Sequence, residues 1–110
     1  MKTKYPSDIT QDQFNRIESI LLTTRKITKP RTVDLHEVFN GLMYLLKSGC
    51  QWNMIPTQYP NYKTIFSYFK KWKETKNDKG ESILEQVLKK INRTRTYKEW
   101  QSMQNFSFDH

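Results

Sequence analysis

The sequence has little of the chemistry on which disulfide-rich and metal-binding proteins depend. Cys50 is the only cysteine among the 110 residues. No intramolecular disulfide can therefore form, which fits a reducing cytosol. The two histidines, His36 and His110, lie far apart and have no histidine or cysteine companions at the spacing of zinc ligands. We therefore expect no disulfide framework and no bound metal.

Long apolar runs are also missing. The longest apolar patch, around residues 42–46, is far too short to span a bilayer. The first residues, MKTKYPSD, contain no apolar segment of the kind found in secretory signal peptides. We expect a soluble, cytoplasmic protein without a membrane partner.

Acidic residues are few, and the middle of the chain lacks them altogether. Eleven Asp and Glu stand against 19 Lys and Arg, which gives a net charge of +8. No acidic residue lies between Glu37 and Glu74, whereas the same window holds Lys47, Lys63, Lys70, Lys71 and Lys73. Such an excess favours polyanionic partners, with nucleic acid first and an anionic membrane surface second.

Catalytic motifs are absent as well. The sequence has no phosphate-binding loop, nucleophile elbow or dinucleotide-binding fingerprint. Asp34 and Glu37 have the spacing of a helix-capping box, which is the simpler explanation for this pair of carboxylates. Carboxylates that hold magnesium for phosphoryl transfer would come from separate elements of a mixed fold, and no strand pattern is present to carry them. We expect no enzymatic activity from this chain alone and no cofactor.

What the sequence does contain is helical periodicity. Apolar residues recur at intervals of three and four residues. This pattern predicts helices over residues 10–22, 35–48, 62–73 and 81–92. The first has a capping-box start at Thr10 and Gln13, and Gly49 suits the left-handed residue that ends many helices. The sequence therefore predicts an all-α protein without a sheet.

The predicted helices suggest a small helix-turn-helix-like domain of three to four helices. We assign residues 1–73 to this domain and residues 74–92 to a polar break with an additional helix. Residues 93–110 show no convincing period, and we expect them to form an irregular, flexible tail. The segment 50–61 is bracketed by prolines but rich in apolar side chains, and we expect Trp52, Met54 and Ile55 to cover the core as a lid. The predicted core contains Leu42, Leu45, Phe66, Phe69 and Trp72 together with Trp52.

The outward face of the helix over residues 62–73 is the first candidate site. An α-helix with a basic outer face is the usual reader of the DNA major groove in helix-turn-helix domains. The candidates for phosphate contacts are Lys63, Ser67, Lys70 and Lys71, and those for phosphates or base edges are Thr64, Ser67 and Tyr68. Two alternatives stay open for this face: a solvated lysine surface that only holds the helix on its core, and a membrane-surface helix.

The connector over residues 23–33 is the second candidate site. It carries four positive charges and no acid, on Arg25, Lys26, Lys29 and Arg31. Because Pro30 disfavours helix at Lys29, we expect an extended segment. This segment could lie along a minor groove as a basic arm, or it could be a flexible linker that only adds solubility.

Several segments resemble the N-terminal region of bacterial insertion-sequence transposases of the family named "IS five". The resemblance covers roughly residues 5–72. Its most specific element is Gly49-Cys50-Gln51-Trp52, followed by a helix with Tyr68, Phe69 and Trp72. The matching segments further include Tyr5–Thr10, Gln13-Phe14, Ile17–Leu22, Pro30-Arg31, Val33–Val38, Ile55-Pro56, Tyr59-Pro60 and Lys63–Phe66. Phe14 and His36 depart from the Trp and Arg that the family usually has at these positions.

In that family the N-terminal region is helix-turn-helix-like and binds the terminal inverted repeats of the mobile element. A following ribonuclease-H-like domain carries an Asp-Asp-Glu triad that binds divalent metal and cuts and joins DNA. The resemblance therefore implies double-stranded DNA as the partner, in the nucleoid of a bacterium. Beyond about Asn92 the sequence no longer follows the family, so no catalytic residue is carried over. We expect a chain truncated before the catalytic domain, which is either a remnant or the first product of an element whose reading frame shifts to make the full enzyme.

Three functional hypotheses follow. The first is the DNA-binding part of a transposase, without cleavage activity of its own. The second is a stand-alone helix-turn-helix regulator, or a repressor of the parent element. The third is an interaction module whose fourth helix and tail bind another chain, through self-association or by recruiting a chain with the catalytic domain.

Overall fold

The computed structural model describes residues 5–22 and 34–107, with side chains through residue 103. Within these ranges the chain forms helices and no β-strand, so the all-α prediction is confirmed. The elements are α1 Gln11–Leu21, α2 Leu35–Ser48, η2 Trp52–Met54 (a 3-10 turn), α3 Tyr62–Glu74, α4 Ile83–Lys90 and α5 Thr94–Ser107. The first three predicted helices end within one residue of these bounds, whereas α4 is shorter at both ends than the predicted 81–92.

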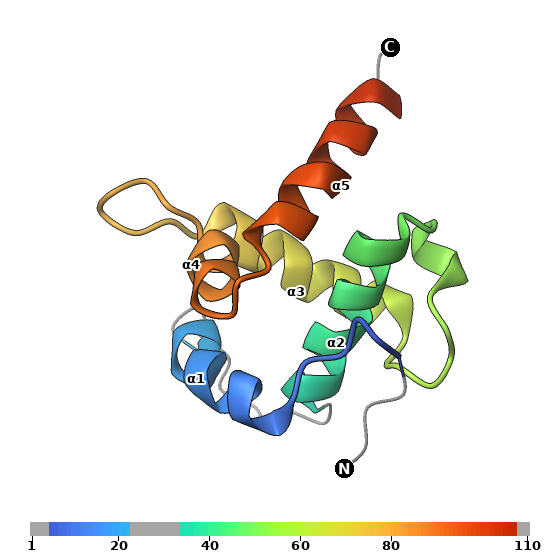
Figure 1. Ribbon diagram of the computed structural model, residues 1–110, viewed down its shortest axis with the longest axis horizontal. Coiled ribbons are helices and arrows are strands. Elements are labelled where there is room, and N and C mark those ends of the chain that lie inside the picture. The colour runs from blue at the N-terminus through green and yellow to red at the C-terminus, as the bar shows by residue number, and fades with distance from the viewer. Residues whose placement is uncertain (1–4, 23–33, 108–110) are drawn as a thin grey trace.

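Helix α2 carries most of the core. Ten of its fourteen residues are buried, and its apolar spacing continues around most of the helix. Asp34 accepts a hydrogen bond from the backbone N–H of His36 at its start, and Gly49 ends it with a left-handed φ of 72°. Helices α3 and α5 pack against α2, while α1 packs against α4 (Figure 1).

Two buried polar side chains of α2 fix the segment that leads into α1. The Asn40 amide oxygen accepts from the Ile9 backbone N–H at 2.8 Å, and His36 Nε2 lies 3.0 Å from the Ile9 carbonyl oxygen. The His36 ring also stacks on Phe14, with ring centroids 4.8 Å apart. From this fixed start, α1 begins with the predicted capping box of Thr10 and Gln13.

The segment between α2 and α3 covers the core only in part. Ile55 is buried and Trp52 is half-buried against the core, as predicted for a lid. Met54 is 65% exposed, so its predicted place in the lid is wrong. The reason is the turn η2, which directs neighbouring side chains to different sides of a short helix.

Helix α4 belongs to the same core as the first three helices. Ser82 and Glu85 form a capping box at its start, and Leu84, Val87 and Leu88 are fully buried. These side chains fill the space between α1 and α3, against both of which α4 packs. The fold therefore extends beyond the first three helices.

The prediction of an irregular tail over residues 93–110 is wrong for most of that segment. Residues Thr94–Ser107 form α5, which rises from the body of the molecule toward the C-terminus (Figure 1). The helix is attached near its start by Tyr97 and Trp100, which are 4% and 9% exposed. The remaining residues through 103 are mostly polar and exposed, so the sequence shows little of the apolar repeat that marks a packed helix.

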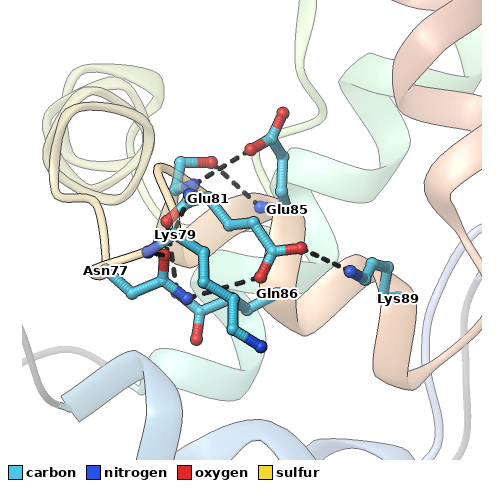
Figure 2. Close-up of polar contacts among 7 residues, drawn as sticks. Asn77, Lys79, Glu81, Glu85, Gln86 and Lys89 are labelled. Carbon is cyan, nitrogen blue, oxygen red and sulfur yellow. Dashed lines mark hydrogen bonds and ion pairs between the residues drawn. The ribbon is translucent and has the colours of Figure 1, made fainter.

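A hydrogen-bonded hairpin joins α3 to α4 and projects from the body (Figure 1). The Asn77 side-chain oxygen accepts from the backbone N–H groups of Lys79 and Glu81, each at 2.9 Å. The Glu81 carboxylate pairs with Lys89 on α4 (Figure 2). This ion pair lowers the pKa of Glu81 and raises the pKa of Lys89. The polar break in the sequence is therefore a defined turn that sets the end of α3 against the start of α4.

Candidate nucleic-acid interface

The inner face of α3 fixes which of its residues point outward. Asn61 caps the helix by accepting from the Lys63 backbone N–H at 2.8 Å. Ile65, Phe69 and Trp72 are buried on one side, and the Trp72 indole N–H donates to the carbonyl oxygen of Leu21 at 3.3 Å. A helix held by three buried side chains and a hydrogen bond to α1 cannot rotate freely, so its outward face is set by the core.

That outward face is basic. Lys63, Ser67, Lys70 and Lys71 are all exposed, and their spacing places them on neighbouring turns of one side of α3. The structure thus brings together the residues predicted from sequence to contact phosphates. The Ser67 hydroxyl donates to the Thr64 carbonyl oxygen at 3.2 Å, which leaves its lone pairs free to accept.

The two uncharged residues predicted to read bases lie at one edge of this face. Thr64 and Tyr68 are both half-buried. The Tyr68 ring packs beside Trp72, with centroids 5.3 Å apart, which fixes the ring at the boundary between core and solvent. Both side chains can therefore reach a ligand only from the flank of the basic face.

A shallow, open hollow occupies the C-terminal half of the same face. It is lined by Phe66, Ser67, Lys70, Lys71, Glu74 and Thr75. Lys70 and Glu74 form an exposed ion pair across it, with nitrogen and oxygen 3.7 Å apart. Glu74 introduces a negative charge at this end of the basic face.

Phe66 departs from the predicted core. It is 43% exposed, whereas Phe69, three residues later on α3, is 4% exposed. The apolar stripe of α3 is wider in the sequence than the side that meets the core, and Phe66 lies at the margin of that stripe. One side of its ring meets Trp52 edge to face, with centroids 5.1 Å apart, and the ring also borders the hollow.

The connector residues Arg25, Lys26, Lys29 and Arg31 lie outside the residues that the structure describes. Their predicted role as a basic arm therefore stays a prediction.

The described groups with shifted pKa values lie away from α3. Burial, followed by the hydrogen bond that its hydroxyl donates to Asp8 at 2.5 Å, raises the pKa of Tyr59. Burial also raises the pKa of Tyr97 and lowers that of Arg93, which donates to the Ser7 carbonyl oxygen at 3.0 Å. Tyr59 and Arg93 tie the N-terminal segment to the core, and Tyr97 is buried on α5, so these are structural contacts.

The described part of the chain offers neither a metal-binding cluster nor a membrane-spanning helix. Over residues 5–22 and 34–107, no three His, Cys, Asp or Glu side chains cluster closely enough to hold a metal ion. No helix in the same ranges is long and apolar enough to cross a membrane.

Sequence reasoning missed two members of the α3 face. The spacing of Phe66 continues the apolar stripe and so predicts a core residue, and only its exposure reveals its place beside the lysines. Glu74 was treated as the end of the acid-free window, yet it lies on the same helix face. The spacing of Lys70 and Glu74, four residues apart on a helix, is the signal that could have found the ion pair.

Comparison with known proteins gave one match. A family model with the description "Putative transposase of IS4/5 family" matches residues 9–77, a range that includes all of α1, α2 and α3. No curated protein and no solved structure matches the chain.

Proposed function

The chain belongs to the family described as "Putative transposase of IS4/5 family", and from that premise we propose that it binds double-stranded DNA. The proposed target is the terminal inverted repeats of an insertion element. The observation that carries the proposal is the outward face of α3, where Lys63, Lys70 and Lys71 are exposed on a helix fixed to the core. Those residues lie within the matched range.

The shape and charge of α3 fit the major groove. The major groove of B-DNA is about 12 Å wide and admits one α-helix. Lysines along the outer face would neutralise phosphates on both sides of the groove and release condensed counterions, which makes binding strong at low salt. A lysine face that is merely solvated would attract DNA only through its charge. Its affinity would then be the same for every DNA sequence.

We divide the roles of the face as follows. Lys63 and Lys71 face the DNA and contact phosphates beside the groove, and Lys70 also contacts the phosphate backbone. Thr64, Ser67 and Tyr68 contact base edges or neighbouring phosphates. Phosphate contacts set the register of the protein, and base contacts give it sequence preference. In this proposal, Arg25, Lys26, Lys29 and Arg31 of the connector add contacts to the backbone.

The proposal gives this chain no strand-cleavage activity of its own. Phosphoryl transfer at a metal site needs several carboxylates that converge on the ion. Cutting and joining would then fall to a catalytic domain, so a partner chain or self-association through a larger assembly is part of the proposal.

The test is a binding titration at several salt concentrations. A duplex site is first selected from a random-sequence pool, and its sequence is compared with inverted repeats that flank the gene. Fluorescence anisotropy then compares wild type, Lys71→Ala, Thr64→Ala and Lys98→Ala on the selected and a scrambled duplex. Lys98 is an exposed lysine on α5 and serves as the matched control.

Lys71→Ala should weaken binding to both duplexes alike and reduce the salt slope by about 1. Thr64→Ala should weaken binding to the selected duplex about 5- to 150-fold, with less effect on the scrambled one, in keeping with about 1 to 3 kcal/mol for a base contact. Lys98→Ala should leave the affinity for both duplexes unchanged. In all cases the DNA should stay uncut with Mg²⁺ or Mn²⁺. If Lys71→Ala and Thr64→Ala both bind as wild type does, α3 is only a solvated face.

A further inference from the structure

Phe66 is a large apolar side chain in a place where a soluble helix would normally carry a polar one. It is 43% exposed and borders the hollow that Ser67, Lys70 and Lys71 line. Nothing in the core requires it there, because Ile65, Phe69 and Trp72 already anchor α3. The exposed part of the ring is therefore accessible to a ligand, beside the lysines of the same helix.

The surroundings of Phe66 decide which kind of ligand fits. Residues 63, 66, 70 and 73 follow one another along one side of α3, so the ring lies in a row with three exposed lysines, namely Lys63, Lys70 and Lys73. An apolar protein partner that covered this ring would also have to remove the neighbouring ammonium groups from water, which is costly. The ligand that fits offers an apolar group flanked by negative charges.

The DNA major groove offers such a combination. Each thymine presents a 5-methyl group there, between the two rows of phosphates, and a phenylalanine ring is among the side chains that contact it. On the proposed DNA-binding face, the lysines would reach the phosphates while the ring between them faces the floor of the groove.

The Phe66 ring is also held in position. Its inner side meets Trp52 edge to face, with centroids 5.1 Å apart and planes at 87°. Trp52 in turn lies 5.4 Å from the ring of the buried Phe69. A ring supported by Trp52, which is itself packed on the buried Phe69, loses little further freedom on binding, which favours contact with a small, defined group.

We propose that Phe66 contacts the 5-methyl group of a thymine in the major groove and so gives the protein a preference for thymine at one position. This inference rests on the proposed DNA-binding function. It adds a residue that distinguishes thymine from other bases, which lysines bound to phosphates do not do. A contact between two copies of the chain through Phe66 is the competing explanation for its exposure.

The experiment replaces thymine by deoxyuridine, one position at a time, in the selected duplex. This change removes the 5-methyl group and leaves the hydrogen-bonding edges of the base pair unchanged. At one position, wild type should lose affinity by about fourfold, the value for one buried methyl group. Phe66→Ala should bind the thymine duplex more weakly and show no further loss with deoxyuridine there. Phe66→Leu, which keeps an apolar side chain, should retain part of the discrimination.

Met103→Ala is the matched control, since Met103 is an exposed apolar residue (51%) on α5. It should show the same deoxyuridine effect as wild type. Phe66→Ala should stay folded, because the ring is at the margin of the core. Circular dichroism should show the helix content of wild type, and thermal unfolding should be cooperative.

The outcomes separate this inference from the proposed function. If wild type binds the selected duplex but no deoxyuridine position matters, or the loss is equal in Phe66→Ala, the thymine contact is overturned and DNA binding stands. If wild type binds no duplex at all, both are overturned. If sedimentation shows a wild-type dimer that Phe66→Ala dissociates, with deoxyuridine having no effect, Phe66 is a contact between copies and the thymine contact is again overturned.

Discussion

Tyr59 connects the segment before α3 to the segment before α1. Its hydroxyl donates to the Asp8 carboxylate, and both side chains are buried. Burial and this hydrogen bond raise the pKa of Tyr59 above its ordinary value of 10. At the residue scale, the pair is the clearest case in which protonation and folding are linked.

The linkage predicts how stability depends on pH. In the unfolded chain the phenol ionises near pH 10, whereas in the folded protein it keeps its proton to higher pH. Its contribution is therefore fully present below pH 10 and declines above it, by about 1.4 kcal/mol per pH unit. Tyr59→Phe should be less stable than wild type at pH 8 by about 1 to 3 kcal/mol, because a buried carboxylate loses a hydrogen bond.

Urea unfolding of wild type and Tyr59→Phe between pH 8 and pH 11 measures this difference. The advantage of wild type should shrink as the pH rises above 10. Two stability profiles that stay parallel across this range would show that Tyr59 titrates alike in both states.

At the scale of the element, α3 has two phenylalanines with opposite surroundings. Phe69 is packed between Trp52 and Trp100 and is 4% exposed, while Phe66 is 43% exposed. Phe69→Ala should therefore destabilise the fold by about 3 to 5 kcal/mol, the range for a buried phenylalanine. Phe66→Ala should cost much less, about 1 kcal/mol or below, because part of the ring is already in water.

Urea unfolding of the two variants measures this difference in the free energy of unfolding. Each variant has the same side-chain truncation on the same helix. Equal losses would mean that Phe66 belongs to the core after all, and its proposed contact with DNA would lose its basis.

The helices themselves show why the sequence predicted some elements well and others poorly. Helices α1 to α3 combine a strong apolar repeat with capping residues such as Thr10 and Asp34, so type and bounds could both be predicted. Helix α5 is attached by Tyr97 and Trp100 near its start, and two apolar residues are too few to define a period. Apolar spacing also could not show that Phe66 falls beyond the edge of the contact with the core.

At the scale of the whole molecule, the core extends further along the chain than the residues that match the family. The match ends at residue 77, whereas the fully buried Leu84, Val87 and Leu88 of α4 complete the core between α1 and α3. The first three helices leave an apolar side that α4 covers. Experiments on the proposed DNA-binding face therefore need the full chain, because removal of α4 would expose the core that fixes α3.

The positive charge is also unevenly distributed along the chain. The net charge of +8 is shared over the chain, but four of the five lysines in the acid-free window between Glu37 and Glu74 lie on α3. Charge pattern alone could predict that a polyanion binds near α3. It could not predict the hollow beside Phe66, because this depends on how α3 is rotated against the core.

The measurement that tests the central claim most directly is a nuclear magnetic resonance titration of ¹⁵N-labelled protein with the selected duplex, with the scrambled duplex as control. If α3 is the DNA-binding helix, the largest amide shifts should cluster at residues 63–71, should be larger with the selected duplex, and should leave residues 98–103 of α5 nearly unchanged. Shifts concentrated on α5, or equal small shifts over the whole chain with both duplexes, would contradict the assignment of α3 as the reader of DNA.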